Sequence, residues 1–387
     1  MKEFEYKMPA KVRFGVGITN NLGRILREEL GFQKAFIATD KGIAAAGILE
    51  KITNSLDGDG FPYQVYDALI PDPTIEVVDE AADVLRNSGA DVVVAVGGGS
   101  PIDTAKAMCM LQTHEGSVRD YLFGGTKQVE RPIMPLICVP TTAGTGSEMT
   151  AASVITNNQE KTKVSVTHEN LIPKMALIDP SLHVGMPPFI TATTGMDALT
   201  HAVESYVSLN AEPISDAMGI AAIRMIGENL RTAVSDGSNL EARTNMALAS
   251  TIAGAAFLNG GLGVVHGIAQ TIGAVAHVAH GTANALLLPY CMERNLVGNL
   301  KKFKQIAQAL GENTDSMTER QAAQAAADAV FQLAKDLHVP MKLKDVGVTR
   351  EMFPEIIKGT MEYRLLAVNP CKLTEKDVEE ILLRAFE

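Results

Sequence analysis

Four side chains in the second half of the chain have the types and the spacing of a metal site. Asp197 and His201 stand four residues apart in a segment of helical composition, so both project from one helix face. The neighbouring residues are small and apolar, and a buried carboxylate there needs compensation, which a divalent cation can supply. Two further histidines, His266 and His280, are each followed by a glycine.

His266 and His280 can share that ion only if the chain bends between them. On one straight helix they would stand about 21 Å apart, and Gly273 is one place where the helix could bend. One aspartate and three neutral imidazoles would then supply four ligands, and a hydroxyl or carbonyl of a substrate could join them. The alternative for any single histidine is a hydrogen-bonded residue of the core.

The first half of the chain contains a glycine turn that could bind phosphate. The apolar segment 91–96 leads into the sequence GGGSP at 97–101, and residues 102–110 have the composition of a helix. A strand, a glycine turn and a helix start form an anion site, because backbone N–H groups approach phosphate oxygens and the helix N-terminus favours negative charge. Pro101 suits the first helical turn, where its missing N–H costs nothing. A plain tight turn is the alternative interpretation.

A second loop, PTTAGTGSE at 140–148, also follows an apolar segment. It combines glycines with four hydroxyl side chains, those of Thr141, Thr142, Thr145 and Ser147. Hydroxyl groups suit phosphate, ribose or carboxamide hydrogen bonds and are poor filler for a core. The two loops together predict a nucleotide site.

Asp40, directly after the apolar segment 36–39, is the candidate for binding the ribose of NAD. Its carboxylate would accept the ribose hydroxyls and repel a 2′-phosphate. In the standard dinucleotide motif the acid follows the glycine loop, whereas Asp40 precedes it. The other glycine pair, Gly15-Val16-Gly17, is not followed by a helix that begins with glycine, as that motif requires. We therefore expect a sheet topology that differs from the standard dinucleotide fold. A helix N-cap is the alternative role of Asp40.

The elements that must position these residues divide the chain into two domains. Up to about residue 182, short apolar segments alternate with helical patterns, which is typical of a parallel α/β sheet. Expected strands are 36–39, 63–66, 91–96, 136–140 and 175–179, expected helices are 42–54, 74–88 and 102–110, and 152–156 and 163–166 form a hairpin. After Pro187-Pro188 only helical patterns remain. We predict an NAD-binding α/β domain over 1–184 and an all-helical metal and substrate domain over 185–387.

Composition excludes several classes of protein. A chain of 387 residues is long for one core, and its net charge of -11 argues against a nucleic-acid partner. No segment is long and apolar enough to span a bilayer, and the N-terminus carries charge where a signal peptide needs an apolar run. The scattered cysteines, Cys109, Cys138, Cys291 and Cys371, indicate reduced thiols and a cytoplasmic protein.

Together these motifs resemble the iron-containing, or group III, alcohol dehydrogenases over essentially the whole chain. The specific segments are GGGSPIDTAK at 97–106, PTTAGTGSE at 140–148, GMDALTHAVE at 195–204, HG at 266–267, HGTANALLLP at 280–289 and NP at 369–370. The resemblance implies a Rossmann-like parallel-sheet nucleotide domain, a C-terminal helical metal-binding domain and a site in the cleft between them. This is the two-domain plan of dehydroquinate synthase.

The family's binding residues can be carried over where the motifs match. The metal ligands would be Asp197, His201, His266 and His280. NAD would be held by Asp40, Gly97, Gly98, Gly99, Ser100, Asp103, Thr141, Thr142, Thr145, Ser147 and Lys163. The metal would be Fe²⁺ according to the family name, although these ligands also suit Zn²⁺, which has the higher intrinsic affinity. We expect a homo-oligomer, a dimer or larger.

The chain departs from the family at the positions that would contact substrate or carry a proton. Many relatives have a histidine four residues after the third ligand, where this chain has Gln270, which cannot titrate. His277 could carry the proton instead, or could simply support the neighbouring ligand. Ala152 aligns with a substrate-facing asparagine of some relatives. Arg364 is either a surface arginine or a residue that binds the anionic group of a substrate.

The predicted function is that of an NAD-dependent, metal-dependent alcohol dehydrogenase or aldehyde reductase. It would transfer a hydride between NAD(H) and a short-chain alcohol or aldehyde, including a diol or an anionic aldehyde such as sulfoacetaldehyde or a semialdehyde. One alternative is a carbon–oxygen lyase of the dehydroquinate synthase type, although such lyases need several basic residues around a phosphorylated substrate. The other is a non-catalytic protein that keeps the nucleotide and metal sites as a relic.

Overall fold

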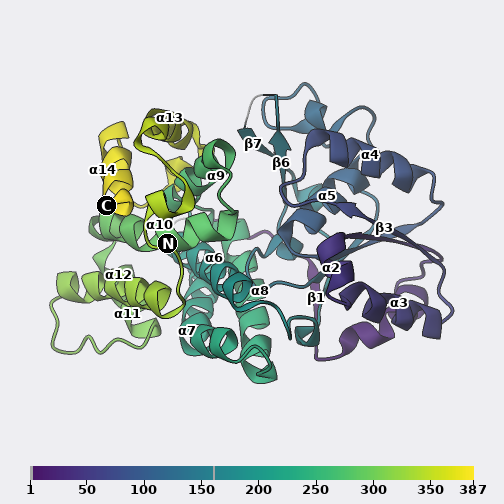
Figure 1. Cartoon of the computed structure of the whole chain (residues 1–387), viewed down its shortest axis with the longest axis horizontal. Helices are drawn as coiled ribbons and strands as arrows, with labels where there is room; N and C mark the ends of the chain where they lie inside the picture. The colour runs from purple at the N-terminus through teal and green to yellow at the C-terminus, as the bar shows by residue number, and fades with distance from the viewer. Residues whose placement is uncertain (1–2, 160–161) are drawn as a thin grey trace. The chain divides into compact units, whose positions relative to one another are not determined.

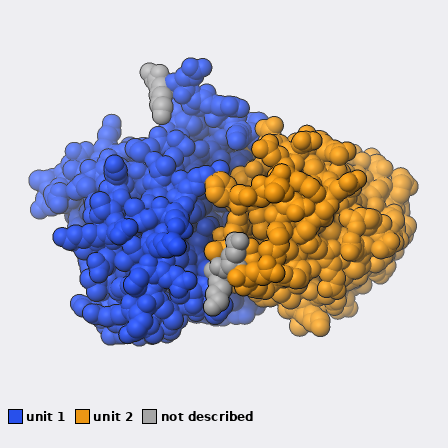
Figure 2. Space-filling model, turned by 90° about the horizontal axis from the view of Figure 1, so that it is seen from above, with its two compact units in different colours: residues 1–8, 143–146, 184–387 blue, residues 9–142, 147–183 orange. Residues whose placement is uncertain are grey.

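The computed structural model describes residues 3–159 and 162–387 and divides the chain into two compact units (Figure 2). The α/β unit comprises Pro9–Thr142 and Ser147–His183, and the helical unit comprises Val184–Glu387 with two short segments from the first half, the chain up to Met8 and Ala143–Gly146. The long segment of the helical unit begins at Val184, and the two short segments come from earlier in the chain. They join the helical unit through tertiary contacts: Lys7 N donates to Asn259 Oδ1 (2.6 Å), and Ala143 packs in the helical core.

A six-stranded sheet in which every neighbouring pair is parallel forms the centre of the α/β unit (Figure 1). The strand order is β1-β8-β5-β4-β2-β3. The strands are β1 (Lys11–Phe14), β2 (Ala35–Asp40), β3 (Tyr63–Leu69), β4 (Val92–Gly97), β5 (Leu136–Pro140) and β8 (Met175–Ile178). The order reverses between β2 and β4, with only β2 and β3 on one side and β1 at the opposite edge. The standard dinucleotide order, 3-2-1-4-5-6, has three strands on each side, so the expected difference in topology is confirmed.

Strand β4 is buried on both faces, as its uninterrupted apolar sequence predicts. Val93 and Ala95 belong to one core cluster, whereas Val92 and Val94 belong to the cluster on the opposite face. Helices α4 (Ile75–Arg86) and α5 (Gly99–Met110) contribute to the first cluster, and α1 (Leu22–Arg24) and α3 (Ile48–Gly58) to the second. The sheet is therefore a rigid support whose strand ends hold the loops after them.

In this unit one predicted helix needs correction, one strand was not predicted, and the predicted hairpin is confirmed. The predicted helix 42–54 is broken into α2 (Lys41–Ala45) and α3, because Gly47 adopts a left-handed conformation with φ 72°. Strand β1 was not predicted, because its sequence KVRF alternates charged and apolar residues at the edge of the sheet. The hairpin is present as the antiparallel strands β6 (Ala152–Asn157) and β7 (Thr162–Thr167).

Nine α-helices form the helical unit within the described residues. They are α6 (Pro188–Val207), α7 (Pro213–Ser235), α8 (Leu240–Gly260), α9 (Val264–Ala276), α10 (His280–Asn295), α11 (Leu300–Ala309), α12 (Glu319–Asp336), α13 (Phe353–Glu362) and α14 (Glu375–Phe386). Helix α6 is buried almost all round because it packs against α7, α8 and α10. Polar side chains on α6 are therefore held inside the unit.

The bend between His266 and His280 lies at His277 and not at Gly273. Gly273 is buried within α9, whereas His277 ends that helix in a left-handed conformation with φ 57°. Helix α10 then begins at His280. The helix is thus interrupted just before the fourth predicted ligand, which lets two consecutive helices contribute to one site.

Among the described residues, no single helix has the length and hydropathy needed to cross a membrane. The pair α8 and α9 meets the criterion only when the two are taken together, and they are bent by 102° at the break between them.

Candidate metal centre and nucleotide-binding loops

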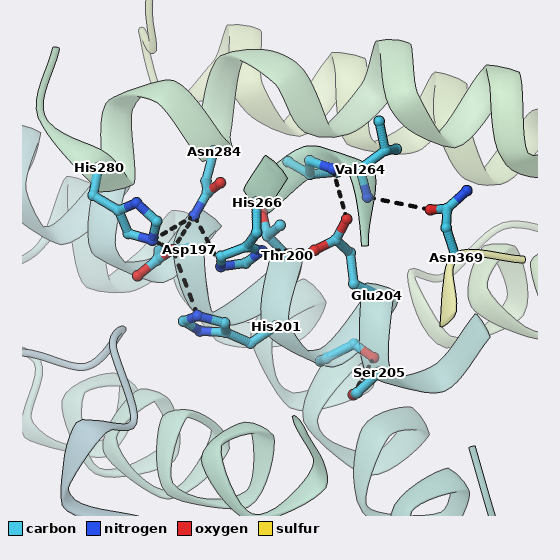
Figure 3. A network of polar contacts seen from close by, with 12 residues as sticks. Asp197, Thr200, His201, Glu204, Ser205, Val264, His266, His280, Asn284 and Asn369 are labelled. Carbon is cyan, nitrogen blue, oxygen red and sulfur yellow. Dashed lines mark hydrogen bonds and ion pairs between the residues drawn. The ribbon is translucent and has the colours of Figure 1, made fainter. Parts of the chain in front are cut away.

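The four predicted metal ligands meet in the helical unit (Figure 3). One ligand atom from each of Asp197, His201, His266 and His280 can be chosen so that all four lie within 4.8 Å of one another. They come from α6, α9 and α10. The side chains of Asp197, His201 and His266 are at most 5% exposed, whereas that of His280 is 33% exposed. The cluster is therefore accessible to solvent on the side of His280.

Hydrogen bonds orient two of the imidazoles so that their Nε2 lone pairs face Asp197. His201 Nδ1 donates to the carbonyl of Gly144 (3.2 Å), and His266 Nδ1 donates to Glu204 Oε2 (2.6 Å). With the proton on Nδ1, Nε2 is an acceptor and can bind a metal. The Nε2 atoms of His201 and His280 lie 3.9 and 3.7 Å from Asp197 Oδ1.

The charge state of the cluster also suits a cation. Burial lowers the pKa of His201 to about 3, despite the neighbouring carboxylate of Asp197, so this ring is neutral near pH 7. Burial alone would raise the pKa of Asp197, but the surrounding imidazoles and the Asn284 amide lower it below its usual value. An ionised carboxylate thus lies beside the neutral ring of His201, and a divalent cation would compensate its buried charge.

Asn284 provides a direct test of whether a cation fits this cluster. Its Nδ2 lies 2.6 Å from Asp197 Oδ1, 3.2 Å from His266 Nε2 and 3.0 Å from His280 Nε2, so one amide faces several acceptors. An amide has only two N–H groups, which cannot satisfy these three acceptors. The Oδ1 atom of Asn284 is buried without a hydrogen-bond partner among the described residues. The donor set is therefore one that a divalent metal would complete.

Glu204 is a candidate functional residue that the sequence analysis did not identify. Its Oε1 atom accepts from Val265 N (2.7 Å) while Oε2 accepts from His266, and its side chain is buried. Glu204 stands seven residues after Asp197 and three after His201, which is the spacing of one helix face. This periodicity was a usable signal, but the partner of Glu204 lies on another helix and could not be read from spacing.

In the α/β unit, Asp40 and the glycine turn lie at the reversal of strand order. Asp40 ends β2, and Gly97-Gly98-Gly99 ends the neighbouring strand β4 and begins α5. Ligands of open α/β sheets bind at the carboxyl ends of the strands at this type of position. Asp40 Oδ1 also accepts from Ile43 N (3.0 Å), so Asp40 is the N-cap of α2 as well.

The predicted contact loops have the close approach and the unsatisfied groups of a nucleotide site. Gly97 has φ 153°, and a Cβ atom added to it would lie 2.6 Å from Pro101 Cγ, so only glycine fits there. The hydroxyl oxygens of Thr141 and Thr142 are buried and have no hydrogen-bond partner among the described residues. A Cβ atom on Gly98 would come within 3.3 Å of Thr142 Oγ1. Unpaired buried hydroxyls beside a bare glycine backbone fit the phosphate or ribose of a dinucleotide.

Asp103 and Ser147, both assigned to NAD from the motifs, are part of a buried network around Lys106. Ser147 Oγ donates to Asp103, and Asp103 Oδ2 accepts from Val154 N (3.0 Å). The ammonium of Lys106 donates to Ser147 O (2.6 Å) and Ala152 O (2.8 Å), and contacts Thr150 Oγ1 (3.0 Å). These bonds join α5, which follows the glycine turn, to the end of the second loop. The network was not identified from the sequence.

The remaining predicted residues lie as follows. Gln270 is one turn after His266 on α9 and is half-buried, and His277 is exposed at the end of that helix. Lys163 on β7 pairs with Asp72 (2.6 Å), and the amide of Asp72 donates to Ser100 Oγ (3.2 Å). Ala152 begins β6, and Arg364 is exposed at the start of the 3₁₀ helix Arg364–Val368. The structure brings none of these into the cluster of four ligands.

Comparison with known proteins identifies the family. The model described as "Iron-containing alcohol dehydrogenase" matches residues 9–180, and that described as "Fe-containing alcohol dehydrogenase family, C-terminal" matches residues 191–386. A 1,3-propanediol dehydrogenase of Citrobacter freundii is 41% identical over 385 residues, which is 99% of both chains. The chain belongs to the iron-containing alcohol dehydrogenase family.

Solved structures of this family agree with the fold. A crystal structure of a 1,3-propanediol oxidoreductase matches with a TM-score of 0.95 at 39% identity and covers 100% of both chains. A sulfoacetaldehyde reductase from Bifidobacterium kashiwanohense, solved in complex with NAD⁺, matches with a TM-score of 0.90 at 29% identity, covering 100% of this chain and 99% of that one. This iron-type dehydrogenase is thus an NAD-dependent, metal-dependent oxidoreductase of alcohols and aldehydes, as the motifs predicted.

Proposed function

We propose that the enzyme reduces a short, neutral aldehyde to its alcohol or diol, and catalyses the reverse oxidation, with the cation held by Asp197, His201, His266 and His280. The observation that supports this most directly is the convergence of these four groups within 4.8 Å in a buried, anionic cluster. A divalent cation, Fe²⁺ or Zn²⁺, supplies Lewis-acid chemistry there: it favours negative charge on the substrate oxygen.

The side chains of the cluster prepare that chemistry. Asp197 is the only carboxylate among the four groups, so a divalent cation held by it and three imidazoles would remain net positive and would attract a developing oxyanion. Glu204 and the Gly144 carbonyl hold the two rings in the tautomer that presents Nε2. We propose that the proton is exchanged through His277, which is exposed, or through water at Gln270, which cannot itself titrate.

We propose further that NAD(H) occupies the switch point of the α/β unit. Asp40 would accept the ribose hydroxyls, residues 97–100 would face the pyrophosphate, and Thr141 and Thr142 would donate their unpaired hydroxyls. Asp103, Thr145, Ser147 and Lys163 would support these loops. Hydride transfer then requires only that nicotinamide C4 and the carbonyl carbon be close and aligned.

The substrate is tested by an aldehyde panel with NADH, in the wild type and in Arg364→Ala. We expect propionaldehyde and 3-hydroxypropionaldehyde to be reduced more efficiently than sulfoacetaldehyde or succinic semialdehyde, with little effect of the substitution on any of them. A preference for the anionic aldehydes that falls about tenfold in Arg364→Ala, the equivalent of one charge-assisted hydrogen bond, would contradict a neutral substrate. Arg350→Ala, which removes an exposed arginine paired with Glu387, is the matched control. No NADH oxidation with any aldehyde would favour the two alternatives, a carbon–oxygen lyase or a non-catalytic protein that retains the nucleotide and metal sites.

The role of Asp40 is tested by Asp40→Asn, which removes the charge but keeps a good N-cap for α2. We expect kcat/KM for NADPH to rise by about tenfold or more, because like-charge contact with a 2′-phosphate costs several kcal/mol. Thermal stability should stay close to that of the wild type, since asparagine also accepts from Ile43 N. An unchanged ratio of NADH to NADPH use would show that Asp40 is only a helix cap.

We propose a cytoplasmic homo-oligomer, a dimer or larger, that acts without a nucleic-acid or membrane partner. The cysteines Cys109, Cys138, Cys291 and Cys371 are all free, which suits a reducing compartment. Light scattering of the purified protein would measure the mass of the assembly against the chain mass of 41.3 kDa.

A further inference from the structure

Helix α9, which carries His266, begins without a local cap. Its N-cap is Gly263, which has no side chain to accept the first amide hydrogens. A Cβ atom at this position would lie 2.7 Å from Asn369 Oδ1 and 3.1 Å from Glu204 Oε1. The glycine therefore lets two distant side chains approach the start of the helix.

Those two side chains replace the missing cap (Figure 3). Asn369 Oδ1 accepts from Val264 N (3.2 Å), and Glu204 Oε1 accepts from Val265 N (2.7 Å), all within the buried interior of the helical unit. A carboxylate at a helix N-terminus is also favoured by the helix dipole. The first amides of α9 are thus satisfied from α6 and from the segment after the 3₁₀ helix Arg364–Val368.

The same groups connect α9 to the rest of the metal cluster. The second oxygen of Glu204 accepts from His266 Nδ1 (2.6 Å), so one carboxylate fixes both the backbone and the ring of this residue. Asn369 Nδ2 donates to Asn295 Oδ1 (2.8 Å) and to Cys371 O (2.8 Å). Asn295 ends α10, the helix that begins at His280. Asn369, in the Asn369-Pro370 motif, therefore links the start of α9 to the end of α10 by hydrogen bonds.

We propose, on the basis of the metal site proposed above, that Glu204 and Asn369 are positioning residues that pre-form this site by fixing the start of α9 and the ring of His266. Glu204 acts on both the helix and the ring, whereas Asn369 acts on the helix alone. Loss of Glu204 should therefore weaken metal binding more than loss of Asn369 does.

The test measures the dissociation constant of Zn²⁺ by competition with a chromophoric chelator, in the wild type and in Glu204→Gln. We expect the affinity to fall by about 10- to 100-fold, the range typical of losing the hydrogen-bond partner of a metal-bound histidine. The matched control is Glu212→Gln. Glu212 is also a buried glutamate that caps a helix of this unit, through Ile214 N (2.8 Å) and Ser215 N (2.6 Å), but it contacts no imidazole. Its substitution should leave the Zn²⁺ affinity within about twofold.

Asn369→Ala provides a second variant in case Glu204→Gln does not fold. It removes the acceptor for Val264 N without touching the ring, and we expect a smaller loss of Zn²⁺ affinity, together with a lower melting temperature of the metal-free protein. Wild-type affinity in both Glu204→Gln and Asn369→Ala would overturn the inference and leave the metal site intact. Failure of the wild type to bind Zn²⁺ would instead overturn the proposed function itself.

Discussion

Replacing Asp197 by alanine is expected to abolish metal binding and to lower kcat/KM for aldehyde reduction by about 1,000-fold or more. A bound cation contributes several kcal/mol of transition-state stabilisation, and each 1.4 kcal/mol corresponds to a factor of ten. Asp197 supplies the only carboxylate of the cluster, and it lies within 4 Å of two imidazole Nε2 atoms, at 3.9 and 3.7 Å. Without it, a cation would be held by three imidazoles and no carboxylate ligand.

The measurement combines metal content by mass spectrometry with steady-state oxidation of NADH. Asp216→Ala is a suitable control, because Asp216 is a partly buried carboxylate of the same unit that pairs with Lys302 (2.6 Å) and contacts none of the four ligands. The control should keep its metal and its activity. An Asp197→Ala protein with wild-type metal content and turnover would disprove the ligand assignment.

Replacing Lys106 by methionine is expected to lower the free energy of unfolding by roughly 3–5 kcal/mol, the usual cost of removing one partner from a buried charged network. The ammonium is fully buried, and burial lowers the pKa of Lys106 although Asp103 opposes this effect. Burial likewise raises the pKa of the neighbouring Glu148 to about 7. Methionine would remove the ammonium that donates to the carbonyls of Ser147 and Ala152.

Lys34→Met is the matched control for this prediction, because the Lys34 ammonium makes one side-chain hydrogen bond among the described residues, to Ser88 O (2.7 Å), in the same unit. We expect it to cost about 1 kcal/mol. Denaturant unfolding followed by circular dichroism measures both, and the fluorescence of bound NADH reports whether the second loop still holds the cofactor. Affinity for NADH should fall in Lys106→Met only. Equal losses of stability in the two variants would contradict the proposal that the Lys106 ammonium holds α5 to the end of the loop 140–148.

Local sequence patterns predicted the elements with strong periodicity and little more. Strand β4 and helix α4 follow from apolar patterns that depend only on neighbours in the chain. Strand β1 did not, because its pairing with β8 joins residues far apart in sequence and its own pattern is half charged. The break at Gly47 and the bend at His277 depend on single left-handed residues, which spacing cannot locate.

In the candidate site, too, only residues that are neighbours along the chain could be paired from the sequence. Asp197 and His201 share one helix face and could be paired from their spacing, whereas His266 and His280 required both the bend and the family motif. The partners that orient them could not be predicted at all. Glu204 meets His266, and Asn369 meets Val264, only through the packing of α6, α9 and the C-terminal segment. Asp103 and Ser147 were assigned to the cofactor from the family motifs, and the bond between them could not be predicted because it too is a tertiary contact.

The central claim is that one carboxylate and three imidazoles hold a single cation, and titration of the metal-free protein with Co²⁺ tests it most directly. We expect one equivalent to bind, with the visible absorption of a low-coordinate nitrogen and oxygen site, and aldehyde-dependent NADH oxidation to rise in proportion to occupancy. His266→Ala should remove both signals. Saturable Co²⁺ binding that persists unchanged in His266→Ala, or NADH oxidation that is independent of the metal, would contradict the claim.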